Sequence, residues 1–479
     1  MRIVMVCVPI MRWVQNHLQL AHVDEFMSSP HLGPYLLASI LDQQGFDISV
    51  MDLACRKSID ETVTEAFESY DVVLLSCNSG NWPTGLQLIK WIKARYPNKI
   101  IVLGGIHATL FGEKLIELHP LIDYLIRGEG ERSLPLLLRA IDGQGPLEGV
   151  PGLVCKNKEG FIKNSPADLQ SPSELDSLPI PLYKEMPADK YNSLSIESSR
   201  GCKGSCTFCA IPFQAHWRPM SPKAFVDKIE ALQPYFPKVK EKHITIVDDC
   251  FTIDRNRVFN IIEEIEKRGL DFNATYNARV RDLLDEALVS KLAPYTRGIL
   301  VGAESFHPET LQKIRKPLNE AEIIQSAENV AKYNIAERTV FSFIIGFPWE
   351  TKNQVKENLN KIENLIIEYN INIFLQWHTL SPGSSIWKSY YDEGRITLSE
   401  MDEFGYFMDK KWFDLSSSLS IEERLDISDI VISLKKVNTF LKGGRGGGVL
   451  FVVPPYLARN PDLTKSWIAE YEEKMKSHP

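Results

Sequence analysis

The chain has 479 residues, of which 44% are hydrophobic and 24% are charged, and this composition excludes a disordered, collagen-like or coiled-coil protein. Lys and Arg number 54 against 62 Asp and Glu, so the net charge of -8 does not favour binding to nucleic acid or to an anionic membrane. No cationic leader begins the chain, and no apolar stretch reaches the ~18 residues that span a bilayer. We therefore expect a cytoplasmic protein of about three domains.

Residues 1–145 alternate short β-branched runs with amphipathic stretches. The predicted strands are Ile3–Val8, Ile48–Asp52, Asp71–Ser76, Ile100–Leu103 and Ile122–Ile126. The predicted helices are Gly33–Gln44, Ile59–Ser69, Pro83–Tyr96, Phe111–Leu118 and Arg132–Ile141. Because parallel neighbours in a sheet need crossovers of about a dozen residues or more, this alternation indicates a parallel sheet covered by helices on both faces.

Three loops that follow predicted strands of this domain are unusually rich in small or polar residues. They are Ser76–Gly80, Gly104–Thr109 and Gly128–Glu131. Ligands of parallel sheets bind beyond the carboxyl ends of the strands, where glycine lets the backbone approach a bulky group. The alternative is that each glycine only turns a strand into the next helix. None of the loops has the Gly-x-Gly-x-x-Gly spacing of a dinucleotide site, which argues against a nicotinamide cofactor.

The loops Gly104–Thr109 and Gly128–Glu131 resemble those of the cobalamin-binding domain that precedes the barrel of radical S-adenosylmethionine (SAM) enzymes. The resemblance implies a Rossmann-like (flavodoxin-like) domain over residues 1–145 that binds cobalamin. The implied cobalamin contacts are Ser76, Asn78, Gly104, Gly105, His107, Gly128, Glu129 and Gly130. The chain departs from many cobalamin domains because it has no Asp-x-His-x-x-Gly motif, which would leave the lower face of cobalt without that His. The alternative for His107 is an ordinary loop residue.

Residues 146–191 are rich in Pro, Ser and Gly and are predicted to link two domains, with a hairpin turn at Cys155–Phe161. A predicted strand at Ser193–Glu197 then leads into a glycine-rich loop with a cysteine motif, which consists of Cys202, Cys206 and Cys209. Three thiolates at this spacing can hold one compact soft-metal centre and leave one corner unligated. The alternatives are a zinc site or idle thiols. A structural zinc site usually needs two Cys-x-x-Cys pairs, and no second pair exists in the chain.

The motif Cys-x-x-x-Cys-x-x-Cys, with Phe208 before its last cysteine, resembles the radical SAM motif, and the resemblance extends over residues 1 to 395. It implies that the three cysteines hold a [4Fe-4S] cluster whose free iron binds the amino and carboxylate groups of SAM. It also implies that Phe208 packs near the adenine. One electron would then break a carbon–sulfur bond of SAM and give a 5'-deoxyadenosyl radical.

The segments that follow the cysteine motif support a barrel. Further predicted strands are His243–Val247, Phe272–Tyr276, Ile299–Ala303, Val340–Ile345 and Ile371–Trp377. Predicted helices are Pro222–Tyr235, Asp254–Lys267, Arg281–Leu292, Glu320–Tyr333 and Lys352–Tyr369. With the strand before the cysteines there are six units, so residues 192–395 are predicted to form a partial (βα)6 TIM-type barrel with its chemistry at the carboxyl ends of the strands.

Polar side chains gather at those strand ends. By similarity to the radical SAM pattern, Glu304 and Ser305 are expected at the ribose of SAM and Arg279 near its carboxylate. The alternative is that Glu304 and Arg279 pair with each other. Asp248 and Asp249 are predicted either to cap the helix that starts near residue 254 or to form a metal pair, for which an isolated Asp-Asp is weak support.

Two later segments depart from a simple barrel pattern. Residues 346–351 read Gly-Phe-Pro-Trp-Glu-Thr where the family usually has Gly-x-Pro-Gly-Glu-Thr, so Trp349 stands in place of glycine and a reshaped loop is expected. Residues 396–479 are predicted to form a small, mostly helical extension, with helices at Ser399–Tyr406 and Ile421–Leu441. The glycine-rich residues 442–448 are expected to be flexible.

These patterns together predict a cobalamin-dependent radical SAM enzyme. The resemblance implies hydrogen abstraction from an unactivated carbon. The outcome that it favours is C-methylation via methylcobalamin. The same cofactors would alternatively support oxidative cyclisation, ring contraction or another rearrangement. A non-catalytic iron–sulfur electron carrier is a distant alternative, because carriers usually close all four cluster positions with protein ligands. The implied partners are a small-molecule, lipid or peptide substrate and an external reductant such as flavodoxin or ferredoxin.

Overall fold

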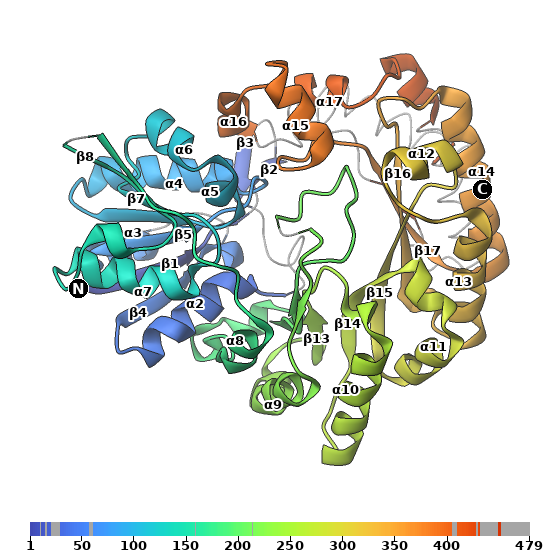
Figure 1. Cartoon of the computed structure of the whole chain (residues 1–479), viewed down its shortest axis with the longest axis horizontal. Helices are drawn as coiled ribbons and strands as arrows, with labels where there is room; N and C mark the ends of the chain where they lie inside the picture. Colours follow the sequence, from blue (N-terminus) through green and yellow to red (C-terminus); the bar gives the residue numbers. More distant parts are fainter. Residues whose placement is uncertain are drawn as a thin grey trace. The chain divides into compact units, whose positions relative to one another are not determined.

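The computed structural model describes residues 1–9, 11–14, 17–20, 29–56, 61–158, 160–212, 214–404, 410–427, 430–431 and 449–451. Contacts between residues divide the chain into two compact units, which the colours of Figure 1 help to follow along the sequence. The first unit comprises Met1–Glu197, Arg218–Thr245 and Thr397–Gly405, and the second comprises Ser198–Trp217, Ile246–Ile396 and Tyr406–Pro479. The linear boundaries at residues 145, 191 and 395 stay a prediction. The glycine-rich residues 442–448 lie outside the described part.

A seven-stranded sheet forms the centre of the first unit, in the order β4-β1-β5-β6-β7-β8-β9. Its strands are β1 (Arg2–Cys7), β4 (Asp47–Asp52), β5 (Val72–Ser76), β6 (Ile100–Gly104), β7 (Tyr124–Ile126), β8 (Leu153–Asn157) and β9 (Gly160–Lys163). The predicted strands are the first five of these, and they pair in parallel. The predicted hairpin is also present, but it extends the sheet with two antiparallel strands, so the sheet is mixed.

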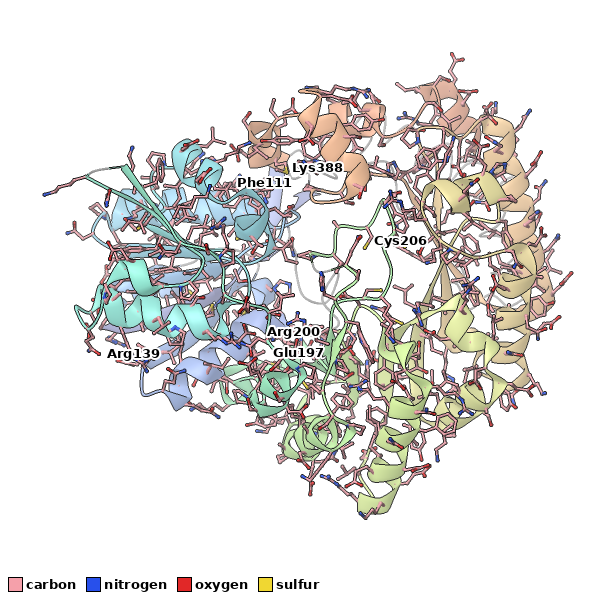
Figure 2. All side chains as sticks on the ribbon, in the orientation of Figure 1. Phe111, Arg139, Glu197, Arg200, Cys206 and Lys388 are labelled. Carbon is pink, nitrogen blue, oxygen red and sulfur yellow. The ribbon has the colours of Figure 1, made fainter. Side chains whose placement is uncertain are left out.

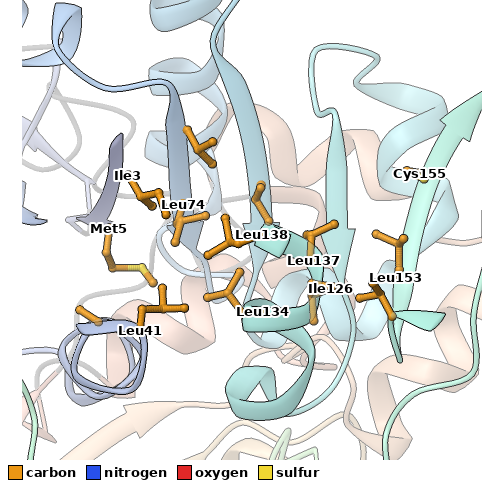
Figure 3. Close-up of a cluster of buried hydrophobic side chains, with 14 of the residues drawn as sticks. Ile3, Met5, Leu41, Leu74, Ile126, Leu134, Leu137, Leu138, Leu153 and Cys155 are labelled. Carbon is orange, nitrogen blue, oxygen red and sulfur yellow. The ribbon is translucent and has the colours of Figure 1, made fainter. Parts of the chain in front are cut away.

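Helices cover both faces of this sheet. They are α2 (Leu32–Gln43), α3 (Glu61–Glu68), α4 (Trp82–Arg95), α5 (Ile106–Phe111), α6 (Glu113–Leu118) and α7 (Gly130–Ile141). Leu41 of α2 and Leu137 of α7 pack against Met5 of β1 in one core, which Figure 3 shows in close-up. The rings of Phe67 in α3 and Trp91 in α4 are 5.7 Å apart, and Figure 1 shows α4, α5 and α6 on the other side of the sheet.

One predicted helix, Phe111–Leu118, is wrong in its extent. The structure instead has α5 and α6, which meet at Gly112. Gly112 has a φ of 51°, a backbone conformation that glycine adopts without a steric penalty and that interrupts a helix. The chain therefore turns at this glycine, and α5 begins directly after the loop that contains Gly104 and Gly105.

A second seven-stranded sheet has the order β10-β13-β14-β15-β16-β17-β18. Its strands are β10 (Ser193–Ile196), β13 (His243–Ile246), β14 (Ala274–Arg279), β15 (Thr296–Glu304), β16 (Thr339–Ile345), β17 (Asn372–Trp377) and β18 (Val449–Phe451). The strands from β14 to β18 pair in parallel. Six of the strands match the six predicted units of a partial barrel, and β18 is a further strand that sequence reasoning did not assign to the sheet.

Helices follow the strands of the second sheet, and Figure 1 shows α10, α11, α13 and α14 along one side of strands β14 to β17. Their bounds are α10 (Arg255–Arg268), α11 (Glu286–Leu292), α12 (Pro308–Lys313), α13 (Glu320–Lys332), α14 (Lys352–Tyr369) and α15 (Ser385–Asp392). A side chain caps the start of each of these six helices, for example Asp254 for α10, Asn319 for α13 and Thr351 for α14. The predicted helix at Arg281–Leu292 is divided into a 3-10 turn and the shorter α11.

The remaining elements are short. They are β2 (Met11–Val14), β3 (His17–Leu20), α8 (Pro172–Ser177), β11 (Ser199–Arg200), β12 (Arg218–Pro219), α9 (Pro222–Leu232), α16 (Met401–Phe404) and α17 (Lys410–Leu415). In the described part of the chain, no helix combines the length and the apolar character that crossing a membrane requires.

Candidate functional site

The three motif cysteines lie on residues 198–217, which we call the cluster loop, and Figure 2 labels the side chain of Cys206 on it. The start of this loop is fixed by Asp248, which follows β13. Its carboxylate accepts hydrogen bonds from Ser198 N, Ser198 Oγ and Ser199 Oγ, each at 2.6 Å. The predicted cap is wrong, because Asp254 and not Asp248 caps α10. The predicted metal pair gains no support, because both oxygens of Asp248 accept these bonds from the loop. The structure instead gives Asp248 the role of an anchor.

The three thiols face one cavity of about 460 Å³. Gly204 N donates to Cys202 Sγ at 3.3 Å, and a Cβ on Gly204 would lie 3.5 Å from Cys202 Sγ and 3.8 Å from Cys206 Sγ. Gln214 Nε2 donates to the carbonyl oxygens of Cys206 at 3.2 Å and Cys209 at 2.7 Å. Burial raises the pKa of the Cys206 thiol and raises that of Cys209 to about 11. The thiols of Cys206 and Cys209 therefore keep their protons until a metal centre replaces them.

This arrangement fits a cluster better than a single ion. Within the described ranges, no three His, Cys, Asp or Glu side chains converge as ligands of one metal ion. An iron–sulfur cluster presents a separate iron atom to each thiolate, so its ligands surround a volume and need not meet at a point. A structural zinc ion instead needs four ligands at one centre. The donor set and the shared cavity therefore fit the predicted iron–sulfur cluster.

A fourth thiol lines the same cavity. Cys250 follows β13, and its Sγ donates to Asp282 Oδ2 at 3.4 Å. Burial raises the pKa of Cys250 to about 12. The sequence gives no sign of this neighbour, because nothing in the local sequence of Cys250 relates it to the cysteine motif.

Glu304, predicted at the ribose of SAM, ends β15 beside the thiols and lines their cavity. Its φ of 68° is rare for a residue other than glycine, and strained backbone of this kind is frequent at functional sites. Its carboxylate pairs with Lys316, with 2.8 Å between Oε1 and Nζ. Burial alone would lower the pKa of Lys316, but the charge and hydrogen bond of Glu304 outweigh burial and raise it. Sequence reasoning missed Lys316, which has no motif to mark it.

The other predicted SAM contacts divide between the cavity and its surroundings. Phe208 and Arg279 line the cavity with the thiols. The alternative pairing of Arg279 with Glu304 is wrong, because Arg279 pairs with Asp282 at 2.6 Å. Ser305 is fully buried, does not line this cavity, and accepts a hydrogen bond from His307 N at 3.0 Å.

Five of the predicted cobalamin contacts surround a second, narrower cavity of about 110 Å³ in the first unit. They lie at the carboxyl ends of the strands and are Ser76, Gly104, Gly105, Gly128 and Gly130. The rest of the lining is apolar and includes Met5, Leu37, Leu74, Val102, Ile126 and Leu134. A Cβ at Gly104 would meet open space, and Gly105 and Gly128 have φ values of 91° and 86°. An apolar slot with a rim of bare backbone fits a flat, mostly apolar part of a large cofactor.

The other three predicted cobalamin contacts do not line this slot. Asn78 Oδ1 accepts from Gly80 N at 2.8 Å and Asn81 N at 3.0 Å and so shapes its own loop. Glu129 forms an ion pair with Arg218.

His107 is fully buried. Its ring stacks on Trp82 with 4.6 Å between centroids, and its Nδ1 is 3.1 Å from Ser79 Oγ. Burial lowers the pKa of His107 to about 3, so the ring is neutral and belongs to the core of the unit.

Two family models match the chain. The B12 binding domain matches residues 27–138, and the Radical SAM superfamily matches residues 196–362. Apart from Met5, the residues that line the second cavity lie within the match to the B12 binding domain, and the cysteine motif lies within the match to the Radical SAM superfamily.

Several curated proteins are similar to most of the chain. An uncharacterized methyltransferase of Pyrococcus horikoshii is 27% identical over 75% of this chain and 78% of its own length. The hopanoid C-3 methylase of Methylococcus capsulatus is 28% identical over 77% of this chain and 70% of its own length. The anaerobic magnesium-protoporphyrin IX monomethyl ester cyclase of Synechocystis is 26% identical over 60% of this chain and 59% of its own length.

A solved structure of similar fold is the radical S-adenosylmethionine methyltransferase TsrM of Kitasatospora setae. It superposes with a TM-score of 0.69 at 17% sequence identity, over 99% of this chain and 98% of that one. At this level of identity the match establishes a shared fold over nearly the whole of both chains.

Proposed function

Because the chain belongs to the B12-binding radical SAM enzymes, we propose that it methylates a carbon atom of a small-molecule substrate. When bound, the [4Fe-4S] cluster supplies the electron that cleaves SAM, and cobalamin supplies a carrier for the methyl group. The observation that carries the proposal is the gathering of three motif thiols and the Glu304–Lys316 ion pair around one cavity. The relatives named a methyltransferase and a methylase, each similar over about three quarters of the chain, support methyl transfer as the outcome.

In this proposal the chain's own residues hold and orient the two cofactors. Cys202, Cys206 and Cys209 would hold the cluster through three of its irons and would leave the fourth iron without a protein ligand from the motif. Glu304 accepts from the ribose hydroxyls of SAM, while the ion pair with Lys316 holds its carboxylate in place.

In the same proposal, two further residues of the cavity lined by the thiols contact SAM, and the apolar slot of the first unit contacts cobalamin. Phe208 packs beside the adenine, and Arg279 faces the carboxylate of SAM with an orientation set by Asp282. In the first unit, the apolar slot and its glycine rim receive part of cobalamin. We propose Asn78 and Glu129 as residues that shape the surrounding loops.

The cluster ligands are tested by anaerobic reconstitution with iron and sulfide. Replacement of Cys206 by Ala should abolish both the visible absorption of the cluster and the formation of 5'-deoxyadenosine from SAM and dithionite. Cys155→Ala, at a buried cysteine of the first sheet, is the matched control and should retain both. A protein that binds no iron, or one whose cluster survives Cys206→Ala, would contradict the proposal.

The outcome of the reaction is tested with SAM that carries an isotopic label on its methyl group. We expect the reconstituted enzyme, supplied with cobalamin, a reductant and the metabolite extract of its source cells, to form 5'-deoxyadenosine, S-adenosylhomocysteine and a labelled product. Formation of 5'-deoxyadenosine with an unlabelled, rearranged product would overturn methylation.

That second outcome corresponds to a second candidate function, an oxidative cyclisation or rearrangement with the same cofactors. It is supported by the relative named a cyclase, although that protein is similar over only 60% of this chain. The residues around the two cavities serve both reactions equally. An external one-electron donor such as flavodoxin or ferredoxin, a lipid or peptide as substrate, and a cytoplasmic location stay predictions from the sequence.

A further inference from the structure

Trp349 stands where the family sequence usually has glycine, and the structure connects it to the cluster loop through an aromatic stack. Its ring is parallel to that of Phe347, with 5.1 Å between centroids and an angle of 12°. Phe347 in turn meets Phe208 edge to face, with 6.2 Å between centroids. Phe208 precedes Cys209 in the cluster loop and lines the cavity. The stack therefore ends beside the thiols.

A second connection passes through hydrogen bonds. Trp349 Nε1 donates to Thr310 Oγ1 at 3.2 Å, and Thr310 Oγ1 donates to Glu350 Oε1 at 2.8 Å. The other oxygen of Glu350 accepts from the backbone N–H groups of Gly346 at 2.8 Å and Phe347 at 3.1 Å. Thr310 and Glu350 are 0% and 1% exposed, so these bonds are shielded from competing water. They fix the indole relative to α12.

The end of α12 holds the cluster loop next to the stack. Thr207 N donates to the carbonyl of Ile314 at 3.1 Å, and Thr207 Oγ1 donates to the carbonyl of Lys313 at 3.3 Å. Thr207 lies between Cys206 and Phe208. Both connections from Trp349 thus reach adjacent residues of the same loop: the stack reaches Phe208, and α12 reaches Thr207.

We propose that Trp349 is a positioning residue, which holds Thr207 and Phe208 and thereby the thiols of Cys206 and Cys209 in the geometry that accepts the cluster and SAM. The inference rests on the proposed function only in taking these cysteines as cluster ligands. The competing explanation is that the indole merely fills space in the core formed by Leu311, Ile314, Ile344 and Phe347. Filling needs bulk alone, whereas positioning needs an aromatic ring in the stack, to which the hydrogen bond of the indole N–H makes a smaller, additional contribution.

The first test uses the cluster-free protein, so it does not depend on enzyme activity. The rate at which iodoacetamide modifies each cysteine is measured by peptide mass spectrometry. Trp349→Leu, which keeps bulk without a ring, is expected to raise the rates of Cys206 and Cys209 about three- to tenfold. Trp349→Phe, which keeps the stack, should stay within about twofold of the wild type, and Thr310→Val should fall between the two. Trp91→Leu, in α4 of the first unit, is the matched control and should change neither rate.

Cys250 distinguishes local loosening from a general loss of structure, because it is buried in the same unit outside the cluster loop. Under the proposal its modification rate stays at the wild-type value in Trp349→Leu. An equal rise at Cys250 would show that the indole only fills the core, and it would overturn the inference. Unchanged rates at Cys206 and Cys209 in Trp349→Leu would overturn it as well.

The second test uses the reconstituted protein. SAM binding is followed by the change it causes in the electron paramagnetic resonance spectrum of the reduced cluster. Trp349→Leu is expected to weaken SAM binding about three- to tenfold at unchanged iron content, and Trp349→Phe to restore it. SAM affinity equal to wild type in Trp349→Leu would contradict the positioning role. Failure of every variant, wild type included, to bind iron would contradict the proposed function alone, since the alkylation rates are measured without a cluster.

Discussion

Gly302 illustrates how a missing side chain keeps an ion pair in place. A Cβ at this position would overlap the carboxylate of Glu304 and lie 2.8 Å from Lys316 Nζ. Glu304 and Lys316 form the ion pair that lines the cavity beside the thiols. The glycine therefore provides the space in which the strained Glu304 meets its lysine.

We expect Gly302→Ala to separate Glu304 from Lys316 and to weaken SAM binding about tenfold, because a hydrogen bond to a charged group is lost. Equilibrium dialysis with the reconstituted protein measures this affinity. Gly298→Ala is the control in the same strand: its Cβ would come only to 3.3 Å from Thr275 Oγ1, and SAM affinity should stay within about twofold of the wild type. Equal SAM affinities of the wild type, Gly302→Ala and Gly298→Ala would contradict the proposed contact between Glu304 and SAM.

His107 predicts the response of the first unit to acid. Burial lowers the pKa of its imidazole from the ordinary value of 6.5 to about 3. Between these pH values the unfolded chain binds a proton at this residue that the folded chain does not. Stability should therefore fall as the pH falls, by about 1.4 kcal/mol per pH unit for this one group. In His107→Gln the acid-side slope of the unfolding free energy between pH 6 and 4 should be shallower by about this amount, measured by urea titration. His216→Gln removes an exposed imidazole and should leave the slope as it is in the wild type.

The cluster loop is an element whose start depends on the end of a neighbouring strand. Asp248 accepts three hydrogen bonds of 2.6 Å from Ser198 and Ser199, at the point where the loop begins. The carboxylate is 2% exposed, so its lone pairs have no access to bulk water as an alternative. The loop's geometry therefore depends on an acceptor 50 residues away in the chain.

Replacement of Asp248 by Asn turns one acceptor atom into a donor and removes the charge. We expect the free energy of unfolding to fall by about 2 kcal/mol, and the iron content after reconstitution to fall with it. Asp47→Asn is the control, because the Asp47 side chain is 70% exposed and its contact with Arg2 is 3.9 Å long. That variant should change stability by less than about 0.5 kcal/mol. Full iron retention in Asp248→Asn would show that the loop does not need this anchor.

An ion pair connects segments of the first unit that are 89 residues apart. Arg218 donates to both oxygens of Glu129, at 3.0 and 2.8 Å, and to the carbonyl of Gln170 at 2.9 Å. Gln170 N donates back to Glu129 at 2.7 Å. The side chains of Arg218 and Glu129 are only 10% and 8% exposed. Breaking a buried pair leaves an uncompensated charge, which makes it costly.

Glu129→Gln is therefore expected to lower the free energy of unfolding by about 3 kcal/mol. Glu174→Gln breaks the more exposed pair of Arg132 and Glu174, whose side chains are 39% and 40% exposed, and should lower stability much less, because solvent screens this pair. Denaturant titration gives both values. A measurement of cobalamin affinity distinguishes a structural role of Glu129 from a direct contact with the cofactor. We expect the folded Glu129→Gln protein to bind cobalamin as tightly as the wild type. Weaker binding without a loss of stability would instead indicate that Glu129 contacts cobalamin.

Local patterns in the sequence were sufficient for five strands of the first sheet, six strands of the second sheet and the cysteine motif, but not for β18, α12 or α15. Hydrophobic periodicity and residue spacing within about ten positions specify such features, because they reflect backbone conformation and short loops. The same reasoning located the glycines at the carboxyl ends of the strands, since chain direction in a parallel sheet brings those ends to one edge. Helix limits were less accurate where a single residue interrupts the pattern, as Gly112 does between α5 and α6.

Side-chain partners depended on the folded chain. Lys316 reaches Glu304 across 12 residues and Arg218 reaches Glu129 across 89, and no spacing rule selects such pairs. Ser305 was predicted at the ribose of SAM but does not line the cavity, and it directly follows β15, whose register with β16 shifts between Gly302 and Glu304. The physical reason is that propensity and periodicity act through neighbours in sequence, whereas ion pairs, cavity linings and strand registers arise from segments brought together by packing.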